Sequence, residues 1–155
     1  MNEQEKQATI TALRLLTATP KSKARLKQKL KEKGYPSQVI EGTVSRLEQD
    51  GLLNDKSFAA SIFQTFSQYR PSGRKRIAFE MKKRGLGEKV IDEMLQKFDP
   101  EAERQAALQL AETKSNRWQK LEPMKRRKKI YDFLLRRGFD FTLAREIVDG
   151  IDKRP

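Results

Sequence analysis

Apolar residues recur along this chain at helical spacing, and the same pattern occurs three times. Each copy contains a glycine, Gly34, Gly85 or Gly138, and these glycines are 51 and 53 residues apart. Apolar residues stand eight and four positions before each glycine, and four others stand 5, 6, 10 and 13 positions after it. These offsets share one face of a helix and do not fit an alternating strand. Each copy therefore predicts a helix, a glycine turn and a second helix.

The predicted core positions of these helix pairs hold apolar side chains in all three copies. They are Leu26, Leu30, Val39, Ile40, Val44 and Leu47, then Ile77, Met81, Val90, Ile91, Leu95 and Phe98, then Ile130, Leu134, Leu143, Ala144, Val148 and Ile151. A fixed period near 50 residues is typical of repeat proteins, whose units are stabilised by contacts with neighbouring units.

An additional amphipathic segment precedes each helix pair. The first spans about residues 4–17, the second follows a predicted N-cap at Asn54, and the third opens with Asp99 and Pro100, an N-cap followed by proline at the first helical position. Their expected buried faces are Ile10, Leu13 and Leu15 or Leu16, then Phe58, Ile62, Phe63 and Phe66, then Ala106, Ala107, Leu110 and Ala111.

The sequence thus predicts an all-α protein, an elongated array of three tandem three-helix repeats with about nine helices. The expected domains are residues 1–53, 54–99 and 100–155, with loops at 69–73 and 116–123. Trp118 is expected to pack in the core or between repeats. Acids near helix starts, among them Glu103, are explained by the helix dipole.

Positive charge is concentrated on the helix before each turn glycine. Residues 21–33, 74–84 and 125–137 carry net charges of +6, +5 and +6, which together exceed the +13 of the whole chain. Such clustering predicts a polyanionic partner that is contacted several times along the molecule. The second helix of each pair is net acidic, which argues against a helix-turn-helix protein that inserts this helix into DNA.

The position of each cation along its helix separates structural from functional roles. Lys33, Arg84 and Arg137 precede the turn glycines, where cations complement the helix dipole. Cations in or near the first turns are opposed by the dipole, so stability does not explain them, whereas a bound anion would. These first-turn cations are Lys21 and Lys23, Arg74, Lys75 and Arg76, and Lys125, Arg126, Arg127, Lys128 and Lys129.

Catalysis finds little support in the composition. The chain has no histidine and no cysteine, which removes the usual zinc ligands, disulfides and most nucleophile–base pairs. We expect a non-enzymatic protein without cofactor or metal. No signal core and no membrane-spanning run is visible, so the expected compartment is the cytoplasm.

Three segments resemble the RecX family of regulatory proteins. They are LEQDGLLNDKSFA at residues 47–59, GRKRIAFEMKKRGL at residues 73–86 and KIYDFLLRRGF at residues 129–139. The resemblance runs from about Ser22 to Ile151. It implies three tandem three-helix units and a regulator of the RecA recombinase in DNA repair, recombination and the SOS response. It further implies binding in the groove of the RecA–single-stranded DNA filament, which hinders filament extension and activity.

Together these observations predict an inhibitor of RecA filaments, acting as a monomer through filament and DNA phosphate contacts. The candidate contact residues are Lys23, Lys27, Arg74, Lys75, Phe79, Lys83, Lys125, Arg126 and Lys128. Phe79 could stack on a base, insert into a protein partner or pack against the next repeat. Two alternatives remain at this point: a sequence-independent DNA- or RNA-binding protein that does not need RecA, and a scaffold that binds protein alone.

Overall fold

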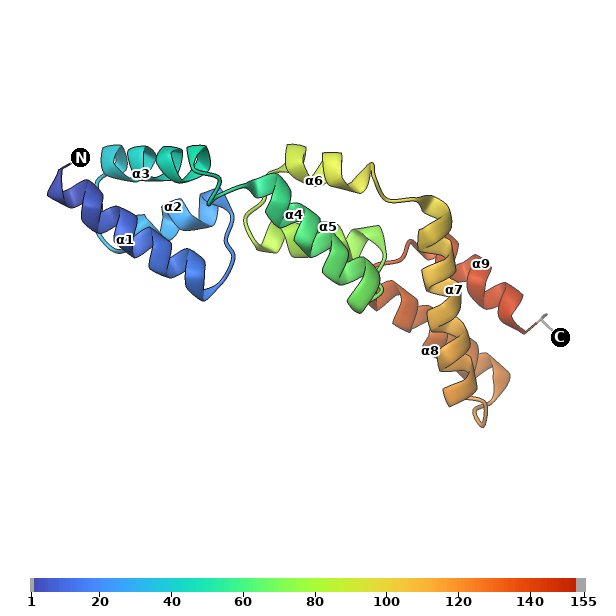
Figure 1. Ribbon diagram of the computed structural model, residues 1–155. Helices are drawn as coiled ribbons and strands as arrows, with labels where there is room; N and C mark the ends of the chain where they lie inside the picture. The colour runs from blue at the N-terminus through green and yellow to red at the C-terminus, as the bar shows by residue number, and fades with distance from the viewer. Residues whose placement is uncertain (1, 153–155) are drawn as a thin grey trace. The chain divides into compact units, whose positions relative to one another are not determined.

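The computed structural model describes residues 2–152, and these form helices without any strand. Figure 1 shows their order along the chain. A π-helical segment, η1 (Thr65–Tyr69), extends α4. The α-helices are α1 (Glu3–Ala18), α2 (Lys23–Glu32), α3 (Ser37–Gln49), α4 (Asp55–Gln64), α5 (Arg74–Lys83), α6 (Glu88–Leu95), α7 (Pro100–Arg117), α8 (Pro123–Arg136) and α9 (Phe141–Ile151). The predicted all-α class and the tandem three-helix repeats are confirmed.

The described residues divide into two compact units. The first holds residues up to Ser61 together with Met81–Ile91, and the second holds Ile62–Glu80 together with residues from Asp92 onward. In the first unit α1, α2 and α3 pack against one another, and in the second α7, α8 and α9 do the same. Each unit is therefore built around one complete three-helix bundle.

The core of the first unit confirms the predicted buried face of the helix pair. Leu26 and Leu30 of α2 are completely buried, and they meet α3 and the small side chain of Ala12 from α1. The complete cluster is Ala12, Leu26, Leu30, Ile40, Val44, Leu47 and Leu53.

The prediction for α1 was wrong in detail. Ile10 and Leu13 are 45% and 38% exposed, whereas Ala8 and Ala12 are completely buried. Because α1 packs against both α2 and α3, the side of α1 at this contact carries small side chains that let helices approach closely. The predicted contact of Leu15 or Leu16 is confirmed, because both are partly buried against this core. The pattern of large apolar residues therefore misplaces only Ile10 and Leu13 and misses the two alanines.

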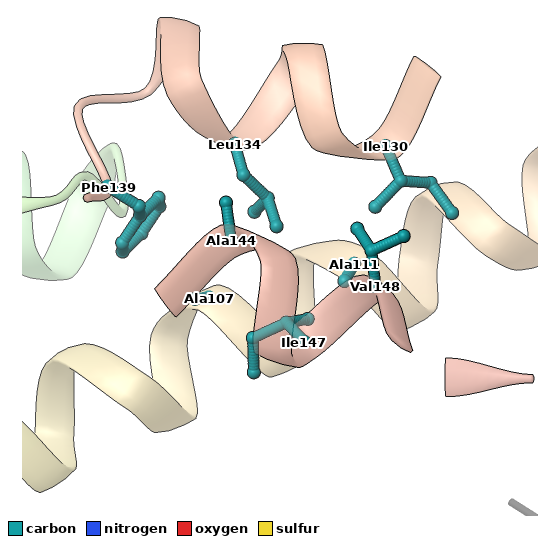
Figure 2. Packing of buried hydrophobic residues seen from close by; sticks show 8 residues of the cluster. All are labelled: Ala107, Ala111, Ile130, Leu134, Phe139, Ala144, Ile147 and Val148. Carbon is teal, nitrogen blue, oxygen red and sulfur yellow. The ribbon is translucent and has the colours of Figure 1, made fainter. Parts of the chain in front are cut away.

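The core of the second unit has the same construction. Figure 2 shows Ile130 and Leu134 of α8 directed at α9, where they pack near Ala144 and Val148. Ala107 and Ala111 of α7 complete the cluster and are fully buried, as predicted. Trp118 is half-buried against this cluster, in agreement with its predicted packing role.

The three turn glycines adopt the same backbone conformation. Gly34, Gly85 and Gly138 have φ values of +92°, +85° and +86°, the left-handed region that favours glycine. In each turn the residue after the glycine donates its N–H to the carbonyl of the apolar residue four positions before the glycine. This Schellman arrangement ends α2, α5 and α8 in the same way, so the repeat seen in the sequence is a repeat in the backbone.

The predicted helix starts are confirmed, and both predicted loops are shorter than expected. The Asn54 side chain accepts a hydrogen bond from the backbone N–H of Ser57. The Asp99 side chain accepts one from the backbone N–H of Glu101. The helix α7 continues through Asn116 and Arg117 before a turn leads to Pro123, because nothing in 112–117 breaks a helix. Likewise, Tyr69 belongs to η1, and the loop before α5 starts only after it.

Candidate polyanion-binding surface

The basic helices α2, α5 and α8 each bury one apolar stripe and expose cations elsewhere. The stripes are Leu26 and Leu30, Ile77 and Met81, and Ile130 and Leu134, and all six side chains are completely buried. Since a stripe at spacing four occupies one side of a helix, the lysines and arginines between its members point away from the core.

Carboxylates of the protein itself occupy the first turns of two basic helices. The N–H of Lys23, the first residue of α2, donates to Asp55 Oδ1 at 2.8 Å. The N–H of Arg74, the first residue of α5, donates to Glu103 Oε2 at 2.7 Å. The anion that the sequence predicts at these helix starts is therefore present within the chain. The third helix, α8, starts with Glu122 and Pro123 and has no side-chain cap hydrogen bond.

The side chain of Lys21 binds the end of α1 and is not directed to an external anion. Its ammonium group donates to the carbonyls of Leu15 and Thr19 at 2.8 and 3.2 Å, and to Thr19 Oγ1 at 2.6 Å. A cation there complements the C-terminal end of the α1 dipole. Burial lowers the pKa of Lys21, with a smaller contribution from Lys29. The prediction of an anion contact for this lysine is corrected to a structural role at the end of α1.

Arg137 is structural, as predicted, although its partner is a carbonyl of a distant loop. Its Nε and Nη2 both donate to the carbonyl of Pro71, at 3.1 and 2.7 Å. Burial lowers the pKa of Arg137, and the neighbouring cations Arg76 and Arg70 lower it further. The loop before α5 is thereby tied to the end of α8.

Four of the predicted contact residues already have acidic partners. Lys23 pairs with Glu48 at 2.9 Å, and the hydrogen bond and charge of Glu48 raise the pKa of Lys23. Lys27 pairs with Glu41 at 3.1 Å. The other two pairs are Arg74 with Glu103 at 3.3 Å and Arg126 with Asp152 at 3.2 Å.

These four pairs differ in how easily a partner could replace the carboxylate. The lysine pairs lie at the surface, with lysine side chains 41% and 32% exposed, and a surface ion pair contributes only about 0–1 kcal/mol. The side chain of Glu103 is only 10% exposed and binds Arg74 through both the backbone and Nε. The side chain of Arg126 is only 18% exposed. Arg74 and Arg126 are thus committed to the fold, while Lys23 and Lys27 can exchange partners at low cost.

The remaining four predicted cations are Lys75, Lys83, Lys125 and Lys128. All are exposed, and their side chains make no hydrogen bond or ion pair with any residue in the range 2–152. Phe79, on α5 between Lys75 and Lys83, is 57% exposed. Lys75 and Phe79, and Phe79 and Lys83, are each four residues apart, so they lie on one side of this single helix.

Arg136 was not among the predicted contact residues. This residue is exposed in α8 and has no hydrogen bond or ion pair among the described residues. It stands eleven positions after Lys125, which at 3.6 residues per turn returns to the same side of the helix. This spacing can be read from the sequence, but the prediction considered only the cations of the first turn of α8 and therefore did not include Arg136.

The described residues contain no cluster of three or more acidic side chains that could hold a metal ion. Among the same residues, no helix is both long and apolar enough to cross a bilayer. Several acids of the described chain instead pair with nearby cations, as the carboxylates of Asp149 and Asp152 do with Arg127 at 2.7 and 3.6 Å.

Three family models match successive segments of the chain. The model described as RecX, first three-helix domain, matches residues 8–47, the second-domain model matches residues 54–95, and the third-domain model matches residues 101–148. The three matches follow one another in the order of the repeats.

Individual relatives agree with these matches. The chain is 35% identical to the regulatory protein RecX of Chlorobium phaeobacteroides over 95% of both chains. It is 33% identical to the regulatory protein RecX of Mycolicibacterium smegmatis, over 93% of this chain and 79% of that protein. The crystal structure of RecX from Lactobacillus salivarius has the same fold, with a TM-score of 0.87, 21% identity and coverage of 99% and 100% of the two chains.

Proposed function

Because the chain belongs to the RecX family of regulatory proteins, we propose that it inhibits the RecA recombinase without catalysing a reaction. In this proposal the protein binds the RecA–single-stranded DNA filament and limits its extension and activity. The observation that carries the proposal is the set of exposed lysines on α5 and α8 that have no partner within residues 2–152 (Lys75, Lys83, Lys125 and Lys128).

The unpaired lysines are suited to a polyanion because they lose no existing partner when they bind. A phosphate that displaces a carboxylate must first compensate for the ion pair that it breaks, whereas a solvated lysine only loses water. We therefore assign the main contacts to Lys75, Lys83, Lys125 and Lys128. Lys23 and Lys27 are secondary contacts. Arg74 and Arg126 stabilise α5 and α8, the helices that carry the four main contacts.

Several linked contacts also explain how a small regulator can hold a filament. Two patches on one chain bind with an effective concentration set by their connection, so their combined affinity exceeds that of either patch. A filament repeats its acidic and phosphate groups along its length, which provides a partner for each patch.

The test is inhibition of RecA ATP hydrolysis on single-stranded DNA by two charge-reversal variants. Lys75→Glu/Lys83→Glu and Lys125→Glu/Lys128→Glu should each weaken inhibition while helicity stays unchanged. The matched control is Lys89→Glu/Lys97→Glu, which changes net charge equally at exposed positions outside the set. Full inhibition by the folded variants, or an equal loss in the control, contradicts the assignment.

The second candidate function is sequence-independent binding of DNA or RNA without RecA, favoured by the same cations. A phosphate binder that makes six contacts loses roughly a thousandfold in affinity between 50 and 200 mM salt. Titration onto RecA with and without single-stranded DNA separates the cases. A filament regulator retains a RecA-dependent component at 200 mM salt, whereas a nucleic-acid binder shows none.

A further inference from the structure

Phe79 is an exposed aromatic residue at a position where the fold does not need one. Its side chain is 57% exposed, while Ile77 and Met81 on the other side of α5 are completely buried. Phe79 stands six residues before its turn glycine, and the equivalent residues are Gln28 in the first repeat and Asp132 in the third. Because both neighbours accept a polar residue there, packing of the repeat does not explain the phenylalanine.

The surroundings of this ring are cationic. Lys75 lies one turn before Phe79, and Lys82 and Lys83 lie one turn after it, all exposed on the same helix. The guanidinium of Arg76 is 5.9 Å from the ring centroid. The one acid of α5, Glu80, is 3% exposed and accepts from Arg76 at 2.9 Å, so the exposed side of the helix presents no carboxylate.

A single strand of nucleic acid presents groups in the same order as this helix face. The lysines precede and follow Phe79 along the helix, and Lys75 and Lys83 are eight residues apart, about 12 Å along the helix axis. That length corresponds to roughly three to four nucleotides of a stacked strand. An unpaired base between phosphates can stack on the ring while the lysines hold the backbone.

We propose that Phe79 is a stacking platform for an unpaired base of single-stranded DNA, with Lys75, Lys82 and Lys83 holding the adjacent phosphates. This inference rests on the proposed function, since it assigns the DNA-contacting part of the same surface. Stacking requires an accessible base face, which a duplex hides. The α5 surface therefore distinguishes single-stranded from double-stranded DNA without reading its sequence.

The experiment compares binding of the full-length protein to a fluorescent (dT)15 strand and to a 15-base-pair duplex at 50 mM salt. Phe79→Ala should weaken binding to (dT)15 by about 10- to 100-fold, as expected for one lost base–aromatic stack, and should leave duplex binding unchanged. Phe79→Trp should retain the affinity. Phe79→Leu, which is apolar but has no aromatic face, should behave like alanine.

Salt dependence and a matched control separate stacking from charge. Phe79→Ala should leave the slope of log affinity against log salt unchanged, whereas Lys75→Gln should reduce it by about 0.7. Phe141→Ala removes a phenylalanine of similar exposure, 54%, from α9 and should have no effect. Stacking is rejected if Phe79→Ala or Phe79→Leu binds (dT)15 like the wild type, or if binding to the duplex falls equally.

Two further results distinguish the inference from the proposed function. If Phe79→Ala weakens binding to RecA without DNA and leaves (dT)15 binding intact, the ring contacts protein and the stacking proposal is wrong. If the wild type binds (dT)15 through Phe79 but does not inhibit RecA ATP hydrolysis, the stacking proposal holds and the proposed regulatory function fails.

Discussion

The carboxylate of Glu103 binds the backbone N–H of Arg74 at 2.7 Å, so a residue of α7 caps the start of α5. The same relationship joins Asp55 of α4 to the N–H of Lys23 at the start of α2, at 2.8 Å. In both cases an acid in the first turn of the following repeat neutralises the positive end of the preceding basic helix. The carboxylates allow these helices to begin with cations at little cost.

We expect Glu103→Ala to lower the free energy of unfolding by about 1.5–3 kcal/mol, because it removes a buried, charged acceptor of two donors from Arg74. Glu103→Gln keeps an acceptor and should cost less. Urea denaturation followed by circular dichroism measures both. Glu101→Ala, an exposed acid of the same helical turn, is the control, and equal losses at both positions would contradict the capping role.

The pairing of Arg127 with Asp149 and Asp152 leads to a prediction of increased binding. Asp149→Asn/Asp152→Asn should release Arg127, whose side chain is 40% exposed, while Arg126 at 18% remains covered. The slope of log affinity for (dT)15 against log salt should therefore steepen by about 0.7, the value for one added phosphate contact.

The control for this change is Glu88→Gln/Asp92→Asn, which removes the same two negative charges at exposed positions of the chain. A local effect of Arg127 steepens the slope only in the first variant. An identical increase in both variants would show that net charge, and not the released guanidinium, sets the affinity.

The fully buried alanines of α1 give a prediction that separates the observed core from the one expected from the sequence. Ala12→Leu should lower the free energy of unfolding by about 1–3 kcal/mol, because the added side chain overpacks the contact with α2 and α3. Ile10→Ala, on the exposed side of the same helix, should cost less than about 1 kcal/mol. Thermal unfolding of the two variants tests this order, and the reverse order would restore the original assignment.

The turn glycine Gly138 is predicted to be intolerant of any side chain. Gly138→Ala combines a left-handed backbone, φ +86°, with overlap between the new Cβ and the backbone of Arg76. The conformation alone costs about 1–2 kcal/mol. Gly42→Ala in the exposed middle of α3 meets no atom within 4 Å and should stabilise the protein by about 0.5–1 kcal/mol. Differential scanning calorimetry of both variants should give changes of opposite sign.

Periodicity predicted the repeat fold because large apolar side chains such as Leu26 and Leu134 mark the buried stripe directly. It did not find the position nine residues after each turn glycine, where Thr43, Met94 and Ile147 are all at most 8% exposed. The threonine in the first copy interrupts the apolar pattern that defines the repeat, although its side chain is buried like the others.

The binding surface was harder to predict because charge is visible in a sequence and pairing is not. The position of Glu103 in the first turn of α7 is already explained by the dipole of that helix. The neighbouring sequence does not show that Glu103 also caps α5, which begins 29 residues earlier. Similarly, Lys23 and Lys75 look alike in the sequence, but only the first lies beside an acid, Glu48. Which cations are available to a partner depends on contacts between helices, and the spacing within one helix does not reveal them.

Gly73 and Gly138 face each other so closely that a methyl group on either would overlap the backbone of the other's segment. A genetic selection for bacteria that have lost this regulator would therefore collect substitutions at both glycines as readily as at contact lysines. The two groups produce the same phenotype for different reasons, loss of folded protein in one and loss of contact in the other. Immunoblots of cellular protein levels are thus needed before any position from such a selection is assigned to binding.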